Sequence, residues 1–140
     1  MAREIKFRAW DIGKSKMVQT NRHALNFDGT GVAYHQTAGR WNYLGSDSYQ
    51  LMQYTGLKDK NGVEIYEDDI VEIKGSDRLG GFGTGYQRGV VEWDGFGFAI
   101  DRTLTGKKYG GHDLGFLRLE LAVIGNIHQN PELLEANHGA

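Results

Sequence analysis

The sequence predicts a mainly β protein: a small barrel preceded by a β segment and followed by a short C-terminal helix. Three observations support this prediction. The 140 residues include 21 glycines and one proline, about twice the usual share of glycine. Short apolar segments alternate with polar residues between the glycines, as strands joined by tight turns do. Near the end, Asn130, Pro131 and Glu132 supply the capping residue, proline and acid that begin a helix, which is expected to end near Asn137 or Gly139.

Residues 1–50 predict the N-terminal β segment. Residues 3–10 alternate between apolar and charged side chains, so that Ile5, Phe7 and Ala9 share one face of a half-buried strand. A turn over 11–14 follows, and Met17 begins a return strand. Between residues 20 and 50 the apolar pieces are short and broken by glycines, which predicts further short strands and loops.

Residues 51–140 predict the barrel domain. Strands at 51–57 and 63–66 flank Asn61-Gly62, a pair that tolerates the positive φ angles of a type I′ hairpin turn. Alternation predicts a strand at 69–73, a hairpin over 90–100 and a strand at 117–121. The apolar run at 122–125 predicts a buried strand. Residues 75–89 are rich in glycine and predict a long loop.

The composition excludes several classes of function. Because the chain has no cysteine, it has no disulfide, no thiolate zinc site and no cysteine nucleophile. Its start is charged, unlike a signal peptide, and no apolar run approaches the length of a membrane span. We therefore expect a soluble cytoplasmic protein that does not bind membranes. The formal net charge of −2 gives no general attraction to nucleic acid.

Three motifs that look like ligand sites are interpreted as scaffold. A calcium loop over 57–68 would need an oxygen ligand at its first position, which is Leu57. The glycine run at 79–85 lacks the Gly-Lys-Ser/Thr ending and the helix of a phosphate loop. No metal, cofactor or enzymatic activity is expected, and the five histidines show no metal-ligand spacing. The acids after residue 60 alternate between strand faces and are expected to face water at a barrel corner; they are Glu64, Glu67, Asp68, Asp69 and Glu72.

Aromatic and basic residues gather in two variable segments. Small barrels bind single strands or peptides with loop aromatics backed by basic side chains, and each stacked base contributes about 1–3 kcal/mol. Four acids close by in the sequence oppose phosphate binding: Glu92, Asp94, Asp101 and Asp113. The candidate nucleic-acid-binding residues, in the loops at 78–88 and 102–109, are Arg78, Phe82, Tyr86, Arg88, Lys107, Lys108 and Tyr109.

Four blocks of the sequence resemble the YopX family of bacteriophage and prophage proteins. They are REIKFRAWD (3–11), LMQYTGLKDKNGVEIYEDDIV (51–71), GVVEWDGFGFAI (89–100) and LAVIGNIHQNPELLE (121–135). The resemblance implies a C-terminal barrel of the SH3-like type and a phage or prophage origin, and it implies no established activity. One departure is Asp68, where family members usually have glycine. If that glycine has a positive φ angle, Asp is among the better substitutes.

The function that these observations favour is a non-enzymatic accessory module that binds or assembles with protein inside a bacterial host cell. Pairing with a second copy, to give a homo-oligomer, would cover the edge strands of a small β protein. The N-terminal strand and the apolar pair Leu133-Leu134 are the elements available for such docking, unless both pack on their own barrel. The alternative function is a nucleic-acid-binding module that uses the two loops.

Overall fold

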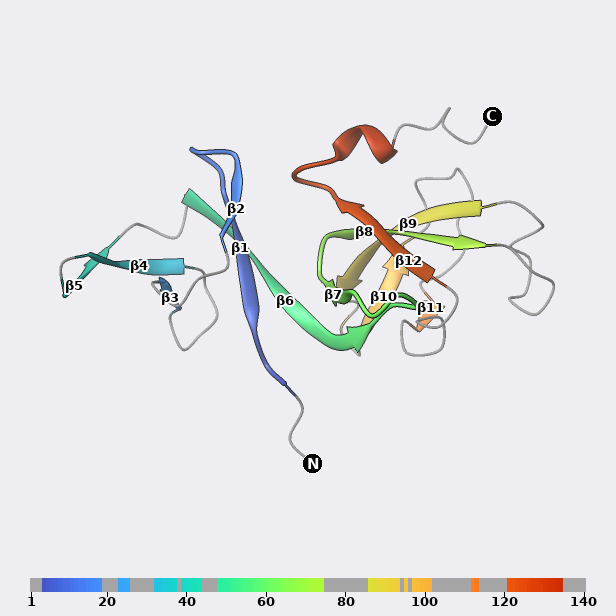
Figure 1. Ribbon diagram of the computed structural model, residues 1–140, viewed down its shortest axis with the longest axis horizontal. Helices are drawn as coiled ribbons and strands as arrows, with labels where there is room; N and C mark the ends of the chain where they lie inside the picture. Colours follow the sequence, from blue (N-terminus) through green and yellow to red (C-terminus); the bar gives the residue numbers. More distant parts are fainter. Residues whose placement is uncertain are drawn as a thin grey trace. The chain divides into compact units, whose positions relative to one another are not determined.

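The computed structural model describes residues 4–18, 23–25, 32–37, 39–43, 48–74, 86–93, 95, 97–101, 112–113 and 121–134. The chain is mainly β, as predicted (Figure 1). It divides into two compact units, Glu4–Gln53 and the part from Tyr54 onward. The sequence analysis divided the chain after residue 50. The structural division falls within strand β6 (Tyr49–Lys58), which continues from the first unit into the second.

The first unit holds two antiparallel sheets. Their strands are β1 (Phe7–Asp11), β2 (Lys16–Val18), β3 (His23–Leu25), β4 (Val32–Thr37) and β5 (Arg40–Tyr43). In one sheet β1 pairs with both β2 and the first half of β6, and in the other β4 pairs with β3 and β5. Ala9 is buried opposite Val18, whereas Phe7 is half-buried and Ile5 is exposed. The predicted apolar face of β1 is therefore covered only toward its C-terminal end.

The second unit is built on a five-stranded antiparallel sheet. The five strands of this sheet are β8 (Asp69–Lys74), β9 (Tyr86–Trp93), β10 (Phe98–Asp101), β11 (His112–Asp113) and β12 (Leu121–Asn126). The unit also contains β7 (Glu64–Tyr66). The sheet order is β11-β10-β9-β8-β12, and β7 pairs with the second half of β6. The sheet curls into a half-barrel, in keeping with an SH3-like barrel.

A compact apolar core holds this second unit together. Ile70 and Val71 are adjacent on β8 and are both 0% exposed, so this central strand is covered on both faces. Each such side chain contributes about 1.5–3 kcal/mol through burial. The core cluster comprises Ile65, Val71, Ile73, Val91, Ile100 and Leu121. No helix in the described ranges has the length and apolar character that crossing a membrane requires.

The predicted short terminal helix is present as a 3-10 turn over Pro131–Leu134. Its expected end near Asn137 or Gly139 lies outside the described residues. The backbone N–H of Leu133 donates to the carbonyl of Asn130 at 3.0 Å, which is the i to i+3 closure of that helix type. The capping residues therefore start a turn as predicted. A four-residue turn is too short to repay the nucleation of an α-helix.

Two predicted loops are also shorter or differently formed. The glycine-rich loop expected over 75–89 ends earlier, because β9 begins at Tyr86. The β6–β7 connection is not a two-residue type I′ turn. Gly62 has a φ of +81°, but Asn61 is not among the residues with positive φ, and five residues separate the two strands. The hairpin itself is present as predicted.

Candidate functional site

The turn between β6 and β7 is organised by the carboxylate of Asp59, which is 5% exposed. Its Oδ1 accepts hydrogen bonds from the backbone N–H groups of Asn61 (2.8 Å) and Val63 (2.9 Å). Its Oδ2 accepts one from the N–H of Val123 in β12 at 2.8 Å. Short Asp side chains favour such turns because they mimic a backbone acceptor. The stretch that looked like a calcium loop is thus a structural turn tied to the sheet.

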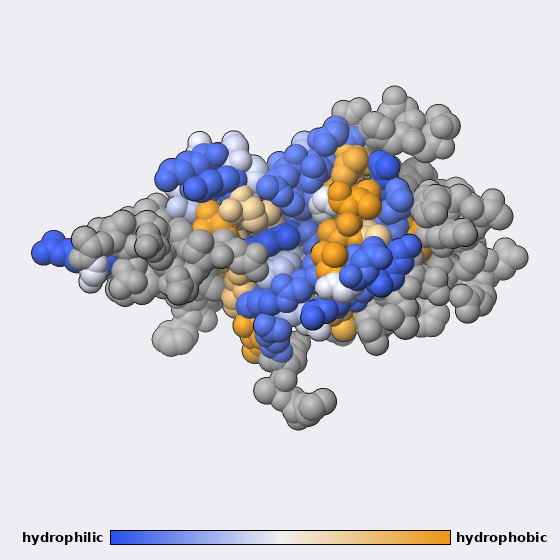
Figure 2. All heavy atoms as spheres, viewed as in Figure 1, coloured by the Kyte–Doolittle hydropathy of each residue, from blue (hydrophilic) through white to orange (hydrophobic). Residues whose placement is uncertain are grey.

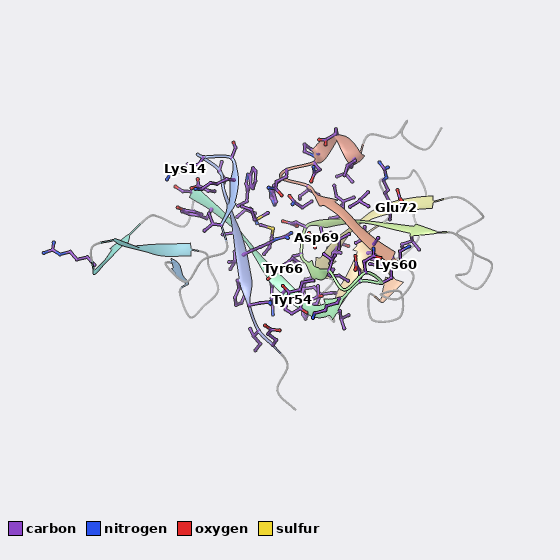
Figure 3. All side chains as sticks on the ribbon, viewed as in Figure 1. Lys14, Tyr54, Lys60, Tyr66, Asp69 and Glu72 are labelled. Atoms are coloured by element: carbon purple, nitrogen blue, oxygen red, sulfur yellow. The ribbon has the colours of Figure 1, made fainter. Side chains whose placement is uncertain are left out.

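The expectation that the acids after residue 60 face water is wrong for Asp69, which is 1% exposed. Its Oδ2 accepts a hydrogen bond from the backbone N–H of Tyr66 at 2.8 Å. Tyr66 packs on Tyr54 across the strand pair, with ring centroids 5.3 Å apart (Figure 3). The turn between β7 and β8 folds Tyr66 back toward Asp69, so the carboxylate meets an amide instead of solvent. A buried carboxylate is tolerated only with such a donor.

Asp68 joins three parts of the second unit. Its φ angle is +68°, the conformation for which a glycine is the usual residue. Its N–H donates to the carbonyl of Val91 at 2.9 Å, and its carbonyl accepts from the N–H of Ile127 at 3.0 Å. The Oδ2 atom lies 2.9 Å from Nε2 of His128. The side chain thereby connects the β7–β8 turn to the segment that leaves β12.

A second set of side-chain bonds shapes the exit from β12. Asn126 is 6% exposed, and its Oδ1 accepts hydrogen bonds from the N–H groups of His128 and Gln129. The Oδ1 of Asn130 accepts from the N–H of Asn126 at 3.2 Å. A Cβ atom on Gly125 would lie 2.5 Å from that same Asn130 oxygen, so any other residue there would displace the Asn130 side chain. This segment directs the chain into the terminal 3-10 turn.

Arg88 is the one predicted nucleic-acid-binding residue whose side chain falls in the described part. It lies in strand β9, where its Nε is 3.2 Å from Oε2 of Glu72 and its Nη1 donates to the carbonyl of Leu133 at 3.1 Å. The guanidinium therefore holds the terminal turn against the sheet. Tyr86 begins the same strand. The other predicted members lie outside the described residues: Arg78, Phe82, Lys107, Lys108 and Tyr109.

In the first unit, Tyr49 has a perturbed pKa. Burial raises the pKa of Tyr49 above its ordinary value of 10.0, and the negative charge of Asp11 and a hydrogen bond to it act in the same direction. Asp11 is 6% exposed and also accepts a hydrogen bond from the N–H of Lys14 at 3.0 Å. Within the described ranges, no three His, Asp or Glu side chains gather as a metal site would need.

An apolar stripe covers β12 and the terminal turn. Residues 122–125 are half-buried, not fully buried as predicted, because β12 is an edge strand of its sheet and pairs with β8 alone among the described strands. Figure 2 shows apolar residues running over β12 toward the terminal turn. Val123 packs against the core of the second unit and is not part of this surface. The other half-buried apolar residues of this segment, called the β12 stripe below, are Ala122, Ile124, Ile127, Leu133 and Leu134.

The sequence reasoning missed two features of the second unit, the half-buried position of 122–125 and the exposure of Trp93. It assigned 122–125 to the interior because a short apolar run does not distinguish a central strand from an outermost one. It also gave no role to Trp93, which is 56% exposed at the end of β9. The signal available for Trp93 was its place beside the turn of a predicted hairpin, where a strand leaves the core.

These features define a small β-barrel protein. Its buried acids accept hydrogen bonds from its turns, and its edge strand β12 carries an apolar stripe. The chain belongs to the YopX family, described as YopX protein, which matches residues 6–135. It is similar to the crystal structure of protein EF1440 from Enterococcus faecalis, with 29% sequence identity and a TM-score of 0.62 over 96% of this chain and 100% of that one.

The fold is also similar to that of protein yopX from Bacillus subtilis. Identity is 22% and the TM-score is 0.63, over 92% of this chain and 97% of that one. A search of curated proteins finds no match. The names of the family and of both relatives state no activity. The comparisons therefore show the fold and the family, but no function.

Proposed function

We propose that this protein is a non-enzymatic phage or prophage accessory module that works by binding or assembling with protein, in the first place with its own copies. The observation that carries the proposal is the β12 stripe. Contiguous apolar surface of this kind is typical of protein interaction sites. Isologous pairing of two copies would remove both stripes from water at once.

The hydrogen bonds at β12 favour packing face to face over the addition of a strand. At its outer edge, the N–H of Val123 is bonded to Asp59, and the carbonyl of Leu121 accepts from the N–H of Lys60 at 3.2 Å. Strand addition needs free backbone groups along an edge. A partner would therefore meet the side chains of the stripe instead of extending the sheet.

The use of the acidic side chains in the fold supports a non-enzymatic role. General acid–base catalysis needs a carboxylate placed beside a substrate. Asp59 accepts three backbone hydrogen bonds, Asp69 accepts one, and Asp68 contacts His128. Each of these contacts has a structural purpose within the second unit.

Light scattering coupled to size exclusion tests the proposal. The wild-type chain is expected to elute as a defined oligomer, and Leu133→Asp is expected to shift it to a smaller species while circular dichroism still reports a β fold. Ile12→Asp is the matched control, because Ile12 is 53% exposed and lies in the first unit. A wild-type chain that stays monomeric at about 100 μM, a concentration at which weak protein pairs associate, would exclude self-assembly.

A different measurement tests the alternative function, which is nucleic-acid binding through the loops at 78–88 and 102–109. Its described basic member, Arg88, already binds Glu72 and the terminal turn. Fluorescence anisotropy of labelled single- and double-stranded oligonucleotides, titrated from low to physiological salt, should show saturable, salt-sensitive binding if this alternative holds. Loss of that binding in Lys107→Ala and Lys108→Ala would place it in the loops.

A further inference from the structure

The Asn61-Gly62 pair in the β6–β7 turn combines an accessible side-chain amide with an uncrowded glycine. Both residues are exposed, and a Cβ atom built on Gly62 would meet nothing within 4 Å. Asparagine is one of the thermolabile residues of proteins, because the main-chain nitrogen of the next residue can attack its amide carbon. A glycine at that next position favours the attack, since it has no side chain to hinder the nitrogen and its backbone is the most permissive.

The reaction that this pair allows is a loss of ammonia followed by the addition of water. A bond forms between the nitrogen of Gly62 and Cγ of Asn61, the nitrogen gives up its proton, and the side-chain amide leaves as ammonia. The product is a five-membered succinimide ring. Water then opens the ring at either of its two carbonyls, which leaves an aspartyl or an isoaspartyl linkage. Water is the one co-reactant, and nothing is oxidised or reduced.

The closed turn restrains this reaction through Asp59. The N–H of Gly62 donates to the carbonyl of Asp59 at 3.0 Å, so the attacking nitrogen is engaged in the turn. The carboxylate of Asp59 accepts hydrogen bonds from the N–H groups on either side, those of Asn61 at 2.8 Å and Val63 at 2.9 Å. Ring closure requires the Gly62 nitrogen to leave its bond and approach the Asn61 side chain. The rate therefore depends on how often the turn opens locally.

Two other asparagines with described side chains provide references within the same chain. Asn126 is 6% exposed, and its Oδ1 accepts hydrogen bonds from two N–H groups. Asn130 precedes Pro131, whose nitrogen has no proton to give up. The Oδ1 of Asn130 also accepts from the N–H of Asn126. Neither residue joins an exposed amide to a following glycine, as Asn61 does.

We propose that Asn61 is a site of spontaneous covalent modification through a succinimide, and that Asp59 controls its rate. The isoaspartyl product adds one main-chain atom to the turn, which changes the spacing of the N–H groups around the Asp59 carboxylate. That carboxylate also accepts from the N–H of Val123, and the N–H of Lys60 donates to the carbonyl of Leu121 (Figure 3). Modification is therefore expected to loosen the turn from β12. The inference does not depend on self-assembly.

Peptide mapping by mass spectrometry, after incubation of the full chain at mildly alkaline pH, tests the inference. A synthetic peptide over residues 57–66 gives the rate at Asn61 when no turn restrains it. Each hydrogen bond of the turn lowers the opened fraction by about twofold to tenfold, and three of them close the turn. The wild-type chain should therefore convert Asn61 at least about tenfold more slowly than the peptide. Asn126 and Asn130 should stay unmodified over the same period.

Two substitutions at Asp59 test its control of the rate. Asp59→Ala removes both carboxylate bonds of the turn and should raise the rate at Asn61 about tenfold, whereas Asp59→Asn keeps an acceptor oxygen for them and should stay within about threefold of wild type. Gly125→Ala is the control for a general loss of stability, because its Cβ displaces the Asn130 side chain and none of the turn bonds. It should leave the rate at Asn61 unchanged. Circular dichroism checks that each variant is folded during the incubation.

Several results would overturn the control by Asp59. These are equal rates in the wild-type chain and the peptide, an Asp59→Ala rate no higher than that of wild type, or a Gly125→Ala rate as high as that of Asp59→Ala. If Asp59→Ala does not fold, the comparison of wild type with the peptide decides. Absence of product at Asn61 in both the peptide and the Asp59→Ala chain would remove the site itself.

Hydrogen exchange measures the effect of the modification on β12. The isoaspartyl form, separated by chromatography after the incubation, is compared with the unmodified chain. The amide of Val123 should exchange faster in the isoaspartyl form, because its acceptor is Asp59 in the altered turn. Equal exchange in the two forms would refute the loosening of the turn from β12.

Discussion

Replacing Asp59 by asparagine or alanine tests how the β6–β7 turn is held to the sheet. The carboxylate accepts three backbone hydrogen bonds, two at Oδ1 from the turn and one at Oδ2 from Val123. Asparagine retains one acceptor oxygen, which can keep the two turn bonds. Its amide group then faces the N–H of Val123, so that two donors oppose each other.

The expected magnitudes follow from which N–H groups water can reach. Asn61 and Val63 are exposed, whereas Val123 is half-buried between the turn and β8. An unsatisfied buried donor costs about 1–3 kcal/mol, so Asp59→Asn should lower the unfolding free energy by about 2 kcal/mol. Alanine also removes the two turn bonds, which water partly replaces, and should cost about 3–5 kcal/mol in total. Against a typical domain stability of about 5–15 kcal/mol, both losses are large.

Hydrogen exchange followed by mass spectrometry, together with urea denaturation, measures these effects. In both variants the amide of Val123 should exchange about thirtyfold faster, as 2 kcal/mol implies, while the peptide over 59–63 loses protection mainly in the alanine variant. Glu132→Gln, at an exposed acid, is the control and should change stability by less than about 0.5 kcal/mol. If asparagine matched wild type, or if both variants cost the same, the assigned roles of the two oxygens would be wrong.

Three further predictions follow from single contacts. Gly125→Ala should cost about 1–3 kcal/mol, seen as a lower urea midpoint with an unchanged slope, because its Cβ would lie 2.5 Å from the Asn130 oxygen. The raised pKa of Tyr49 beside Asp11 means that the folded chain holds this proton more tightly than the unfolded chain. The stabilisation that protonated Tyr49 gives the folded chain is complete below about pH 10 and is lost as pH rises through the folded pKa. Urea midpoints from pH 9 to 11.5 should therefore fall more steeply for wild type than for Tyr49→Phe. Asp68→Gly should be about 1 kcal/mol more stable than Asp68→Ala by urea denaturation, since both remove the carboxylate but only glycine relieves the positive φ of +68°.

The strands were predictable because their signal is local. A sheet with one covered face imposes a period of two on the sequence, and the first strand of the hairpin over residues 90–100 follows that period. The strand at 69–73 was also predicted from alternation, although Ile70 and Val71 are buried on its two faces. The position of each strand within its sheet, which this alternation does not encode, was not predictable. The run at 122–125 reads the same whether its strand is central or outermost, and only the sheet order decides how far it is buried.

The candidate site depended even more on contacts that are distant in sequence. Arg88 was assigned to a candidate nucleic-acid-binding loop because basic and aromatic residues surround it in the sequence. Its partners Glu72 and Leu133 lie 16 and 45 positions away, and no local pattern connects them. Asp69 was placed in water because strand alternation ignores the turn before it, which brings the N–H of Tyr66 to its carboxylate.

The family resemblance is carried largely by residues that brace the second unit. Blocks 51–71 and 121–135 contact each other directly, through Asp59 and Val123 and through Asp68 and His128. Membership of the YopX family therefore reports a shared scaffold, and most of its matching residues are accounted for by folding. Trp93 also lies in a matching block, 89–100, yet it is 56% exposed and supports little of the core. Its one described aromatic contact is with Phe98 across the hairpin, so burial in the core does not explain why this position carries an indole.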